Sequence, residues 1–410
     1  MADVRRQDAE TLQGSPLEVF LVFLKLGLTS FGGPIAHLGY YRDEIVVRRR
    51  WIDDAGYGDL VALCQFLPGP ASSQVGFSLG VLRGRGLLGG VAAWLAFTLP
   101  SAAILLAFAL GAAAFTGPVA DGFLHGLKLV AVAVVAQAVW GMAKTLTPDR
   151  TRAGIALAAL AIVIFVSGSF GQIAAIILGA AFGLWLCRTK GSAPIHSHLH
   201  VPISRRQGTV ALILFAALLV LPPLAISTGE NSPLALFDAF YRSGALVFGG
   251  GHVVLPLLQA EVVAPGWVTN ENFLAGYGIA QAIPGPLFTF AAYLGAMATA
   301  APNAFAGALI ALVAIFLPGL LLVYGMLPYW SALRGFPSAQ AAMRGANAAV
   351  VGILAAALYH PVWTSAVLSP RDFLLALAGF LLLTVWKLPS WTVVACLATA
   401  GTLFGLAAHG

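Results

Sequence analysis

Long apolar stretches separated by short polar stretches follow one another along almost the whole chain. Several of them carry no Asp, Glu, Lys or Arg, and each is long enough for one or two membrane crossings, since a spanning helix needs ~20 mostly apolar residues. These charge-free stretches are residues 86–120, 153–187, 207–229, 272–333 and 388–410. They are rich in Ala, Leu, Gly and Val and lack the two-residue alternation of a barrel strand, so they predict membrane helices.

Thirteen apolar segments can be distinguished, and together they predict an all-α protein that crosses the membrane many times. They cover residues 17–39, 58–81, 87–113, 121–145, 152–167, 171–187, 208–228, 234–257, 273–298, 303–327, 340–360, 372–386 and 389–408. The fifth, sixth and twelfth segments are short for a full crossing.

Composition and charge support this class of protein and exclude others. Charged residues make up 9% of the chain, against ~25% in a soluble domain, which excludes a disordered chain, a coiled coil and an ordinary soluble enzyme. The net charge of +6 comes from basic clusters between apolar segments, which is typical of loops that set membrane topology and not of a nucleic-acid surface. The three cysteines lie far apart, so no disulfide framework, metal site or cofactor is expected.

The two halves of the chain match each other in order, which indicates an internal duplication of a six-segment unit. A shift of 217 residues places Lys25, Gly27, Phe31, Gly32, Gly33 and Glu44 on Arg242, Gly244, Phe248, Gly249, Gly250 and Glu261. A shift of 216 places Trp51, Gln65, Pro68, Gly69 and Pro70 on Trp267, Gln281, Pro284, Gly285 and Pro286, and a shift of 219 places Gly126 on Gly345. We expect a cytoplasmic tail at 1–16, a first repeat at 17–190, a cytoplasmic loop with a linker helix at 191–232, and a second repeat at 233–410.

Six segments plus one linker segment give the second repeat the opposite orientation, an arrangement that is common in transporters. The loop charges agree, because residues 40–57 contain four arginines whereas the equivalent residues 258–272 contain no Lys or Arg. The positive-inside rule therefore places the first loop in the cytoplasm and the second outside. We expect the N-terminus in the cytoplasm and the C-terminus outside an inner (plasma) membrane.

Four of the segments have a helix-breaking centre. These centres are Phe31-Gly32-Gly33-Pro34 and Pro68-Gly69-Pro70 in the first repeat, with Phe248-Gly249-Gly250-Gly251 and Pro284-Gly285-Pro286 in the second. The basic clusters that flank the first two segments all belong to the cytoplasm by the charge rule. We therefore expect four re-entrant hairpins, entering from the cytoplasm in the first repeat and from outside in the second, together with nine full crossings. The alternative is thirteen crossings with one violation of the charge rule.

The four breaks carry the functional hypothesis. Non-helical backbone in a membrane is tolerated where it lines an enclosed or watery cavity, and a half-helix that begins there points free N–H groups into that cavity. The paired breaks predict one anion site at the repeat interface, although Gly and Pro also occur in membrane helices without such a role. The residues expected at this site are Phe31, Gly32, Gly33, Pro68, Gly69, Pro70, Ser72, Phe248, Gly249, Gly250, Gly251, His252, Pro284, Gly285 and Pro286.

Cations and amides near the breaks extend this candidate site. The cations are Lys25, Lys128, Arg242 and Arg344. Each of them either attracts an anion or extends its side chain to the membrane surface. Gln65 and Gln281 either donate to an oxyanion or bond a neighbouring helix. His37 and His252 do not coincide in the two repeats, and a lone histidine is more often structural than a proton carrier.

Other polar residues are expected to play no direct part. Glu44 and Glu261 do coincide, but they follow the apolar segments and we expect them in loops. His196, His198 and His200 are spaced by two in a polar stretch, which is more typical of a solvated linker than of a metal site. There is no nucleophile elbow, phosphate-binding loop or helical pair of metal ligands, so the chain is not expected to be an enzyme.

At these residues the sequence resembles the chromate ion transporter (CHR) family in its long, two-domain form. The resemblance rests on Ser30-Phe31-Gly32-Gly33-Pro34 with His37, on Gln65-Phe66-Leu67-Pro68-Gly69-Pro70, on the run from Phe248 to Pro256, on Glu261-Val262-Val263 and on Pro284-Gly285-Pro286. It covers residues 17–365. It implies chromate efflux and chromate resistance, with sulfate as a competing or alternative substrate.

Physical arguments sharpen this implied function and leave three functions open. A dianion that leaves a negative interior gains ~4.6 kcal/mol per 100 mV, roughly a thousandfold in gradient or more, so export needs no proton coupling. The three functions are a chromate exporter, a transporter or channel for sulfate or another oxyanion, and a membrane enzyme or assembly subunit. The absence of a catalytic cluster disfavours the third. The expected partners are the dianion and the lipid bilayer, without nucleic acid, and the arrangement is compatible with a homodimer.

Overall fold

The computed structural model describes residues 14–112, 117–166, 168–187, 201–226, 232–300, 302, 304–330 and 336–409. All regular elements in these ranges are helices, which confirms the predicted all-α fold. The three histidines at 196–200 lie outside the described residues, as does most of the predicted tail at 1–16.

In the first repeat, two broken segments precede four continuous helices. The first broken segment consists of α2 (Pro16–Thr29) and α3 (Gly33–Tyr41), and α3 continues into a π-helical stretch, η1 (Arg42–Arg48). The second consists of α4 (Asp54–Phe66) and α5 (Ala71–Arg83). The continuous helices are α6 (Leu87–Ala112), α7 (Pro118–Leu146), α8 (Arg150–Phe165) and α9 (Ser169–Leu186).

The linker helix α10 (Arg205–Ala225) leads to a second repeat with the same order of elements. Its first broken segment contains α11 (Pro233–Ala245), η2 (Gly251–Val253), α12 (Val254–Leu258) and the π-helical η3 (Gln259–Val263). Its second contains α13 (Asn270–Ala280), η4 (Leu287–Thr289) and α14 (Phe290–Met297). There follow α15 (Ala304–Met326), η5 (Leu327–Tyr329), α17 (Pro337–Ala357), η6 (Leu358–Trp363), α18 (Thr364–Ala366), α19 (Pro370–Thr384) and α20 (Ser390–His409).

Equivalent helices begin with equivalent caps. Asp53 precedes α4 and accepts a hydrogen bond from Gly56 N at 2.8 Å, while Thr269 precedes α13 and accepts one from Asn272 N at 3.3 Å. These two residues are related by the shift of 216 that the sequence shows. Because each cap satisfies an N–H group that the first helical turn leaves unpaired, both repeats start this helix at the same point.

Six helices among the described residues are long and apolar enough to cross a membrane. They are α6, α7, α9, α10, α15 extended by η5, and α17 extended through α18. The helices α8 and α19 are shorter, and so is the apolar part of α20, Ser390–Leu406. The chain is therefore a multi-pass membrane protein, while nine full crossings stay a prediction.

The first broken segment of each repeat turns back on itself. Lys25 Nζ lies 3.1 Å from Glu44 Oε2, and Arg242 Nη2 lies 2.9 Å from Glu261 Oε2. Each pair is 19 residues apart in sequence, which in a continuous helix corresponds to about 28 Å. The chain therefore reverses direction near the break. Re-entry, in which both arms open to one side of the membrane, and the side of entry both stay predictions.

The second broken segment of the second repeat shows the same reversal. Tyr293 OH donates to Asn272 O at 3.1 Å, and the rings of Phe273 and Phe290 lie 5.4 Å apart with their planes inclined at 68°. The helices α4 and α5 also pack against each other in the first repeat.

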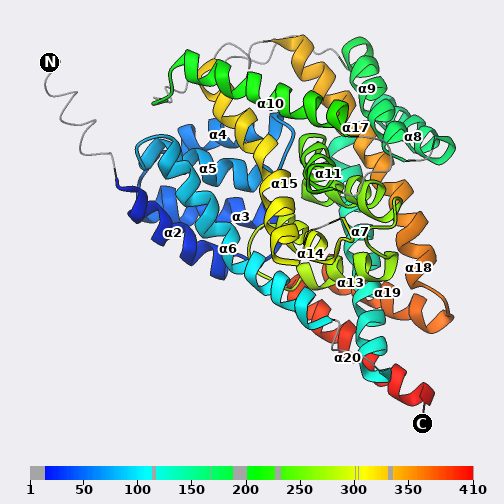
Figure 1. Ribbon diagram of the computed structural model, residues 1–410. Helices are drawn as coiled ribbons and strands as arrows, with labels where there is room; N and C mark the ends of the chain where they lie inside the picture. Colours follow the sequence, from blue (N-terminus) through cyan, green and yellow to red (C-terminus); the bar gives the residue numbers. More distant parts are fainter. Residues whose placement is uncertain are drawn as a thin grey trace, which may run out of the picture.

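The two repeats interlock through their last helices. Helices α8 and α9 pack against α17 of the second repeat, while α19 and α20 pack against α7 of the first (Figure 1). Glycines make these contacts close, because a Cβ at Gly126 would overlap Leu397 O and one at Gly345 would overlap Gly179 O. Small residues at helix crossings are a common means of association in membranes.

The helices α6 and α15, called the central helices below, contact the broken segments of both repeats. Within its own repeat, α6 packs against α2 and α5, and α15 packs in the same way against α11 and α14. Across the interface, α14 contacts α6 and α5 contacts α15. The breaks are thus brought together by helices from both halves of the chain.

Candidate functional site

Two reciprocal hydrogen bonds join the breaks of one repeat to those of the other. Gly69 N donates to Val247 O at 2.7 Å, and Gly285 N donates to Ser30 O at 2.9 Å. Gly69 and Gly285 are equivalent, and so are Ser30 and Val247 under the shift of 217. Such an exchanged pair is what a twofold relation between the repeats produces. All four breaks therefore meet at one interface.

The glycines at these two positions are required by space and by backbone conformation. Gly69 has φ +121° and Gly285 has φ +103°, where L side chains are strained. A Cβ at Gly69 would lie 3.1 Å from Gly319 Cα on α15, and one at Gly285 would lie 2.8 Å from Ser101 Oγ on α6. The backbone therefore approaches a central helix closely at both breaks.

Buried polar atoms without a hydrogen-bond partner gather near the breaks of the first repeat. Within the described residues, they are Ser30 Oγ, His37 Nε2, Ser73 Oγ, Gln74 Oε1 and Thr98 Oγ1. His37 connects several of these elements, since its Nδ1 lies 3.4 Å from Ser72 Oγ and its ring meets Phe97, the neighbour of Thr98, edge-on at 5.3 Å. Buried polar groups are normally paired, so the three hydroxyl groups are available to an oxyanion or to water. Gln74 Oε1 can only accept a hydrogen bond, so it is available to water and not to an oxyanion.

A glutamine that sequence reasoning missed joins the break to the other repeat. Gln74 Nε2 donates to Pro68 O at 2.9 Å and to Gly319 O at 3.0 Å. The equivalent position in the second repeat is Phe290, so the duplication could not point to Gln74. Of the two predicted glutamines, Gln65 is exposed, whereas Gln281 keeps a buried Nε2 without a partner in the described part of the chain.

The predicted cations Lys25 and Arg242 are each paired with a carboxylate. The expectation that Glu44 and Glu261 lie in loops is wrong, because they lie in η1 and η3, the π-helical continuations of the two hairpins. Arg242 also donates to Asp238 Oδ2 at 2.8 Å. These contacts join the two arms of each hairpin. This role was not predicted from the sequence, where the cations were expected either to attract an anion or to extend to the membrane surface.

The charges around these equivalent pairs differ between the repeats. Glu44 accepts hydrogen bonds from Arg49 at 2.8 Å and from Arg48 at 3.1 Å in addition to Lys25, so three cations surround one carboxylate. Burial raises the pKa of Glu44, but these hydrogen bonds together lower it to about 2. In the second repeat, by contrast, the single guanidinium of Arg242 pairs with the two carboxylates of Asp238 and Glu261.

The cations on the long helices differ in their surroundings. Lys128 is half-buried on α7 and forms no ion pair with the described residues. Its neighbour His125 lies 2.8 Å from Asp372 Oδ1 on α19. On α17, Arg344 is half-buried, and Asn347, the equivalent of Lys128, has its Oδ1 3.7 Å from where a Cβ of Gly249 would stand. The fourth segment of the second repeat therefore approaches a break.

The remaining predicted residues lie in the breaks or in the turn that follows. Gly32 and its equivalent Gly249 are exposed, so the first break of each repeat is accessible from the surface. A Cβ at Gly251 would lie 3.3 Å from Pro34, which places one first break against the other. His252 Nδ1 lies 2.8 Å from the OH group of Tyr277 on α13.

Comparisons with known proteins point to one family for both repeats. The sequence model of the chromate transporter family matches residues 17–184 and again residues 234–402. A chromate transport protein of Pseudomonas aeruginosa is 30% identical over 395 residues, which cover 93% of this chain and 90% of that protein. A protein of the same name from Cupriavidus metallidurans is 29% identical over 401 residues, covering 96% and 93%. No solved structure matches this chain.

Proposed function

The chain belongs to the chromate transporter family, a family of transporters and not of enzymes, and we propose that it exports chromate from the cytoplasm. The observation that supports this substrate is the family match to both repeats, together with two relatives of nearly full length that are named chromate transport proteins. In this proposal the protein lies in the plasma membrane with its N-terminus inside and its C-terminus outside, and export confers chromate resistance.

The proposed substrate site is the junction of the four breaks. A tetrahedral dianion needs several converging N–H and O–H donors, which the helix ends and the unpaired hydroxyl groups of Ser30, Ser73 and Thr98 can supply. Lys128 adds a cation that no described carboxylate neutralises. In this proposal Lys25 and Arg242 line the transport path. The passing dianion takes the place of the glutamate that is paired with each of these cations.

The membrane potential favours export over uptake. Each elementary charge that moves across it is worth ~2.3 kcal/mol per 100 mV, and a dianion carries two. An interior that is negative therefore drives the dianion outward without a coupling ion. Uptake of the same ion would require protons or cations to travel with it.

Sulfate is the second candidate substrate. Chromate and sulfate share charge and tetrahedral shape, and backbone N–H groups with hydroxyl groups form most of the proposed site. Donors of this kind distinguish such ions weakly, because they respond to oxygen positions that the two ions share. Sulfate should therefore compete with chromate.

Chromate uptake into everted membrane vesicles tests the proposal. Vesicles that contain the protein should accumulate chromate when the lumen is made positive, above vesicles from cells with an empty vector, and excess sulfate should reduce this uptake. Transport of sulfate without chromate would overturn the substrate and keep the transporter. No movement of any oxyanion by the folded protein would overturn both.

Two lysines of the same helix give a matched test of the site. Lys128 is half-buried in α7, whereas Lys144 lies exposed in its last turn with its Nζ 4.4 Å from the centre of the Trp140 ring. Lys128→Gln should lower the initial rate of chromate uptake about tenfold, a loss of roughly 1.4 kcal/mol, while Lys144→Gln should leave it unchanged. Equal rates for both variants and the wild type would remove Lys128 from the site.

A further inference from the structure

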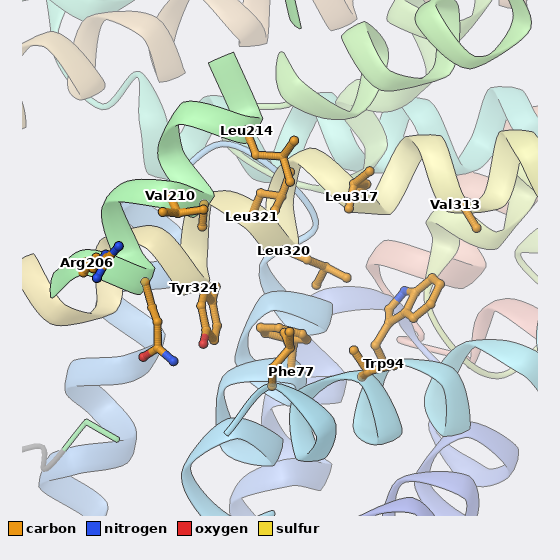
Figure 2. A pocket seen from close by; sticks show the side chains of 14 residues that line it. Phe77, Trp94, Arg206, Val210, Leu214, Val313, Leu317, Leu320, Leu321 and Tyr324 are labelled. Carbon is orange, nitrogen blue, oxygen red and sulfur yellow. The ribbon is translucent and has the colours of Figure 1, made fainter. Parts of the chain in front are cut away.

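A groove of about 550 Å³ lies outside the proposed substrate site, between the linker helix α10 and the central helices (Figure 2). Phe77 and Trp94 line it from the first repeat, Leu317 and Leu320 from α15, and Val210 and Leu214 from α10. Val210 is 59% exposed and Leu214 is 44% exposed, and α10 is the least buried of the six candidate spans. The groove therefore faces the region that lipid tails occupy in a membrane.

Among the described residues that line this groove, positive charge is found at one end only. Arg206 lies at the same end as Tyr324, whereas Val313 and Trp94 lie at the other end (Figure 2). Arg206 is exposed, and so is Arg85, two residues before the lining residue Leu87. From Val313 to Tyr324 the α15 wall is about 16 Å long, at the helical rise per residue. The groove is thus apolar along its length and cationic at its mouth.

We propose that this groove binds one anionic phospholipid of the surrounding bilayer. Its phosphate would pair with Arg206, whose guanidinium matches phosphate oxygens, and one acyl chain would lie along α15. Basic pockets between membrane helices on the cytoplasmic side are suited to anionic head groups, and the loop charges place the N-terminus of α10 on that side. The apolar walls alone would accept any acyl chain, so the arginine provides the preference for an anionic lipid.

A lipid in this position would connect the two repeats through the linker. Helices α5 and α6 come from the first repeat and α15 from the second, while α10 packs on α15 and α11. Leu320 lines the groove next to Gly319, which contacts the break at Gly69 and Pro70. Because a ligand that binds only the folded state stabilises it by mass action, the bound lipid should raise the melting temperature.

Native mass spectrometry of the purified full-length protein tests the preference for charge. Detergent solutions would contain either phosphatidylglycerol or phosphatidylcholine of the same chain length. The wild type should retain one phosphatidylglycerol per chain at detergent conditions that remove phosphatidylcholine, and Arg206→Gln should reduce this retention about tenfold. Arg150→Gln is the control, because Arg150 is exposed at the first turn of α8 and does not line the groove. Equal retention of both lipids by the wild type would overturn the proposal.

Two tryptophan substitutions on α10 test the location. Val210→Trp would fill the groove, whereas Ile213, which is 63% exposed and does not line the groove, receives the same substitution as a control. Phosphatidylglycerol should raise the melting temperature of the wild type and of Ile213→Trp by several degrees, and that of Val210→Trp by less than one degree. Melting in phosphatidylcholine shows that each variant is folded. A full shift in folded Val210→Trp would place the lipid elsewhere.

Discussion

At the scale of residues, the two repeats form equivalent ion pairs that differ in burial and in the number of charged neighbours. The pairs Lys25–Glu44 and Arg242–Glu261 close the same hairpin in the two repeats. The Lys25 side chain is 51% exposed and its glutamate has two further cations, whereas the Arg242 side chain is 28% exposed and is shared by two carboxylates. Removal of one partner from a buried pair costs more than removal from an exposed pair, since an unpaired buried charge remains.

This difference predicts unequal losses of stability. Arg242→Ala should lower the free energy of unfolding by about 3 kcal/mol, because Asp238 and Glu261 are left without their cation. Lys25→Ala should lower it by about 1 kcal/mol or less. Denaturant unfolding in a mild detergent measures both, and losses that agree within experimental error would contradict the unequal roles of the two pairs.

The glycines of the breaks should be equally sensitive in both repeats. Gly69→Ala and Gly285→Ala should each destabilise the protein by about 1–3 kcal/mol, because both combine a positive φ with close contact to a central helix. Gly39→Ala is the matched control, since Gly39 lies in helix α3 and a Cβ there meets nothing within 4 Å. Thermal unfolding should show a neutral or slightly stabilised control. A tolerated Gly69→Ala would argue against the tight junction described here.

At the scale of elements, the apolar segments predicted most helices within a few residues of their ends. The segment 303–327 corresponds to α15 (Ala304–Met326), and 372–386 to α19 (Pro370–Thr384). Helix length and breakage follow from local hydropathy and from Gly and Pro. The π-helical stretches η1 and η3 were not predicted, because the hydropathy pattern does not distinguish a π-helix from an α-helix.

The close approach of helices from different repeats depends on glycine, and a single substitution can test this. Gly345→Val should separate α17 from α9, since its side chain would occupy the place of Gly179 O, and should cost several kcal/mol. Gly154→Val on α8 is the control, because a Cβ there meets nothing within 4 Å. Protein yield after detergent extraction and the melting temperature are the measurements. Similar values for the two variants would show that this crossing does not need glycine.

At the scale of the whole molecule, the duplication and the interlocked helices describe one body with a twofold relation between its halves. The helices α8 and α9 pack on α17, and α19 and α20 pack on α7, so neither half carries its own complete set of contacts. The family match to each repeat agrees with this division. Opposite orientation of the two repeats in the membrane stays a prediction, because it requires an odd number of intervening crossings.

Cysteine labelling of equivalent positions tests that orientation. Ala55 in α4 and Glu271 in α13 are both exposed and are related by the shift of 216. After replacement of the three native cysteines, Ala55→Cys should react with a membrane-impermeant thiol reagent only in everted vesicles, and Glu271→Cys only in intact cells. The charge asymmetry of their loops sets these expected sides. Labelling of both variants from the same side would contradict the inverted arrangement.

The sequence by itself determined the class of protein, the duplication and the positions of the four Gly- and Pro-rich breaks, because these depend on local hydropathy and on Gly and Pro at matched spacing. Only the tertiary structure decided which groups meet. Gly69 donates to Val247, Lys25 pairs with Glu44, and Gln74 donates to Gly319 on α15. The first and last of these contacts join opposite halves of the chain, and all three depend on how the chain reverses and how both repeats pack together, which no local pattern contains.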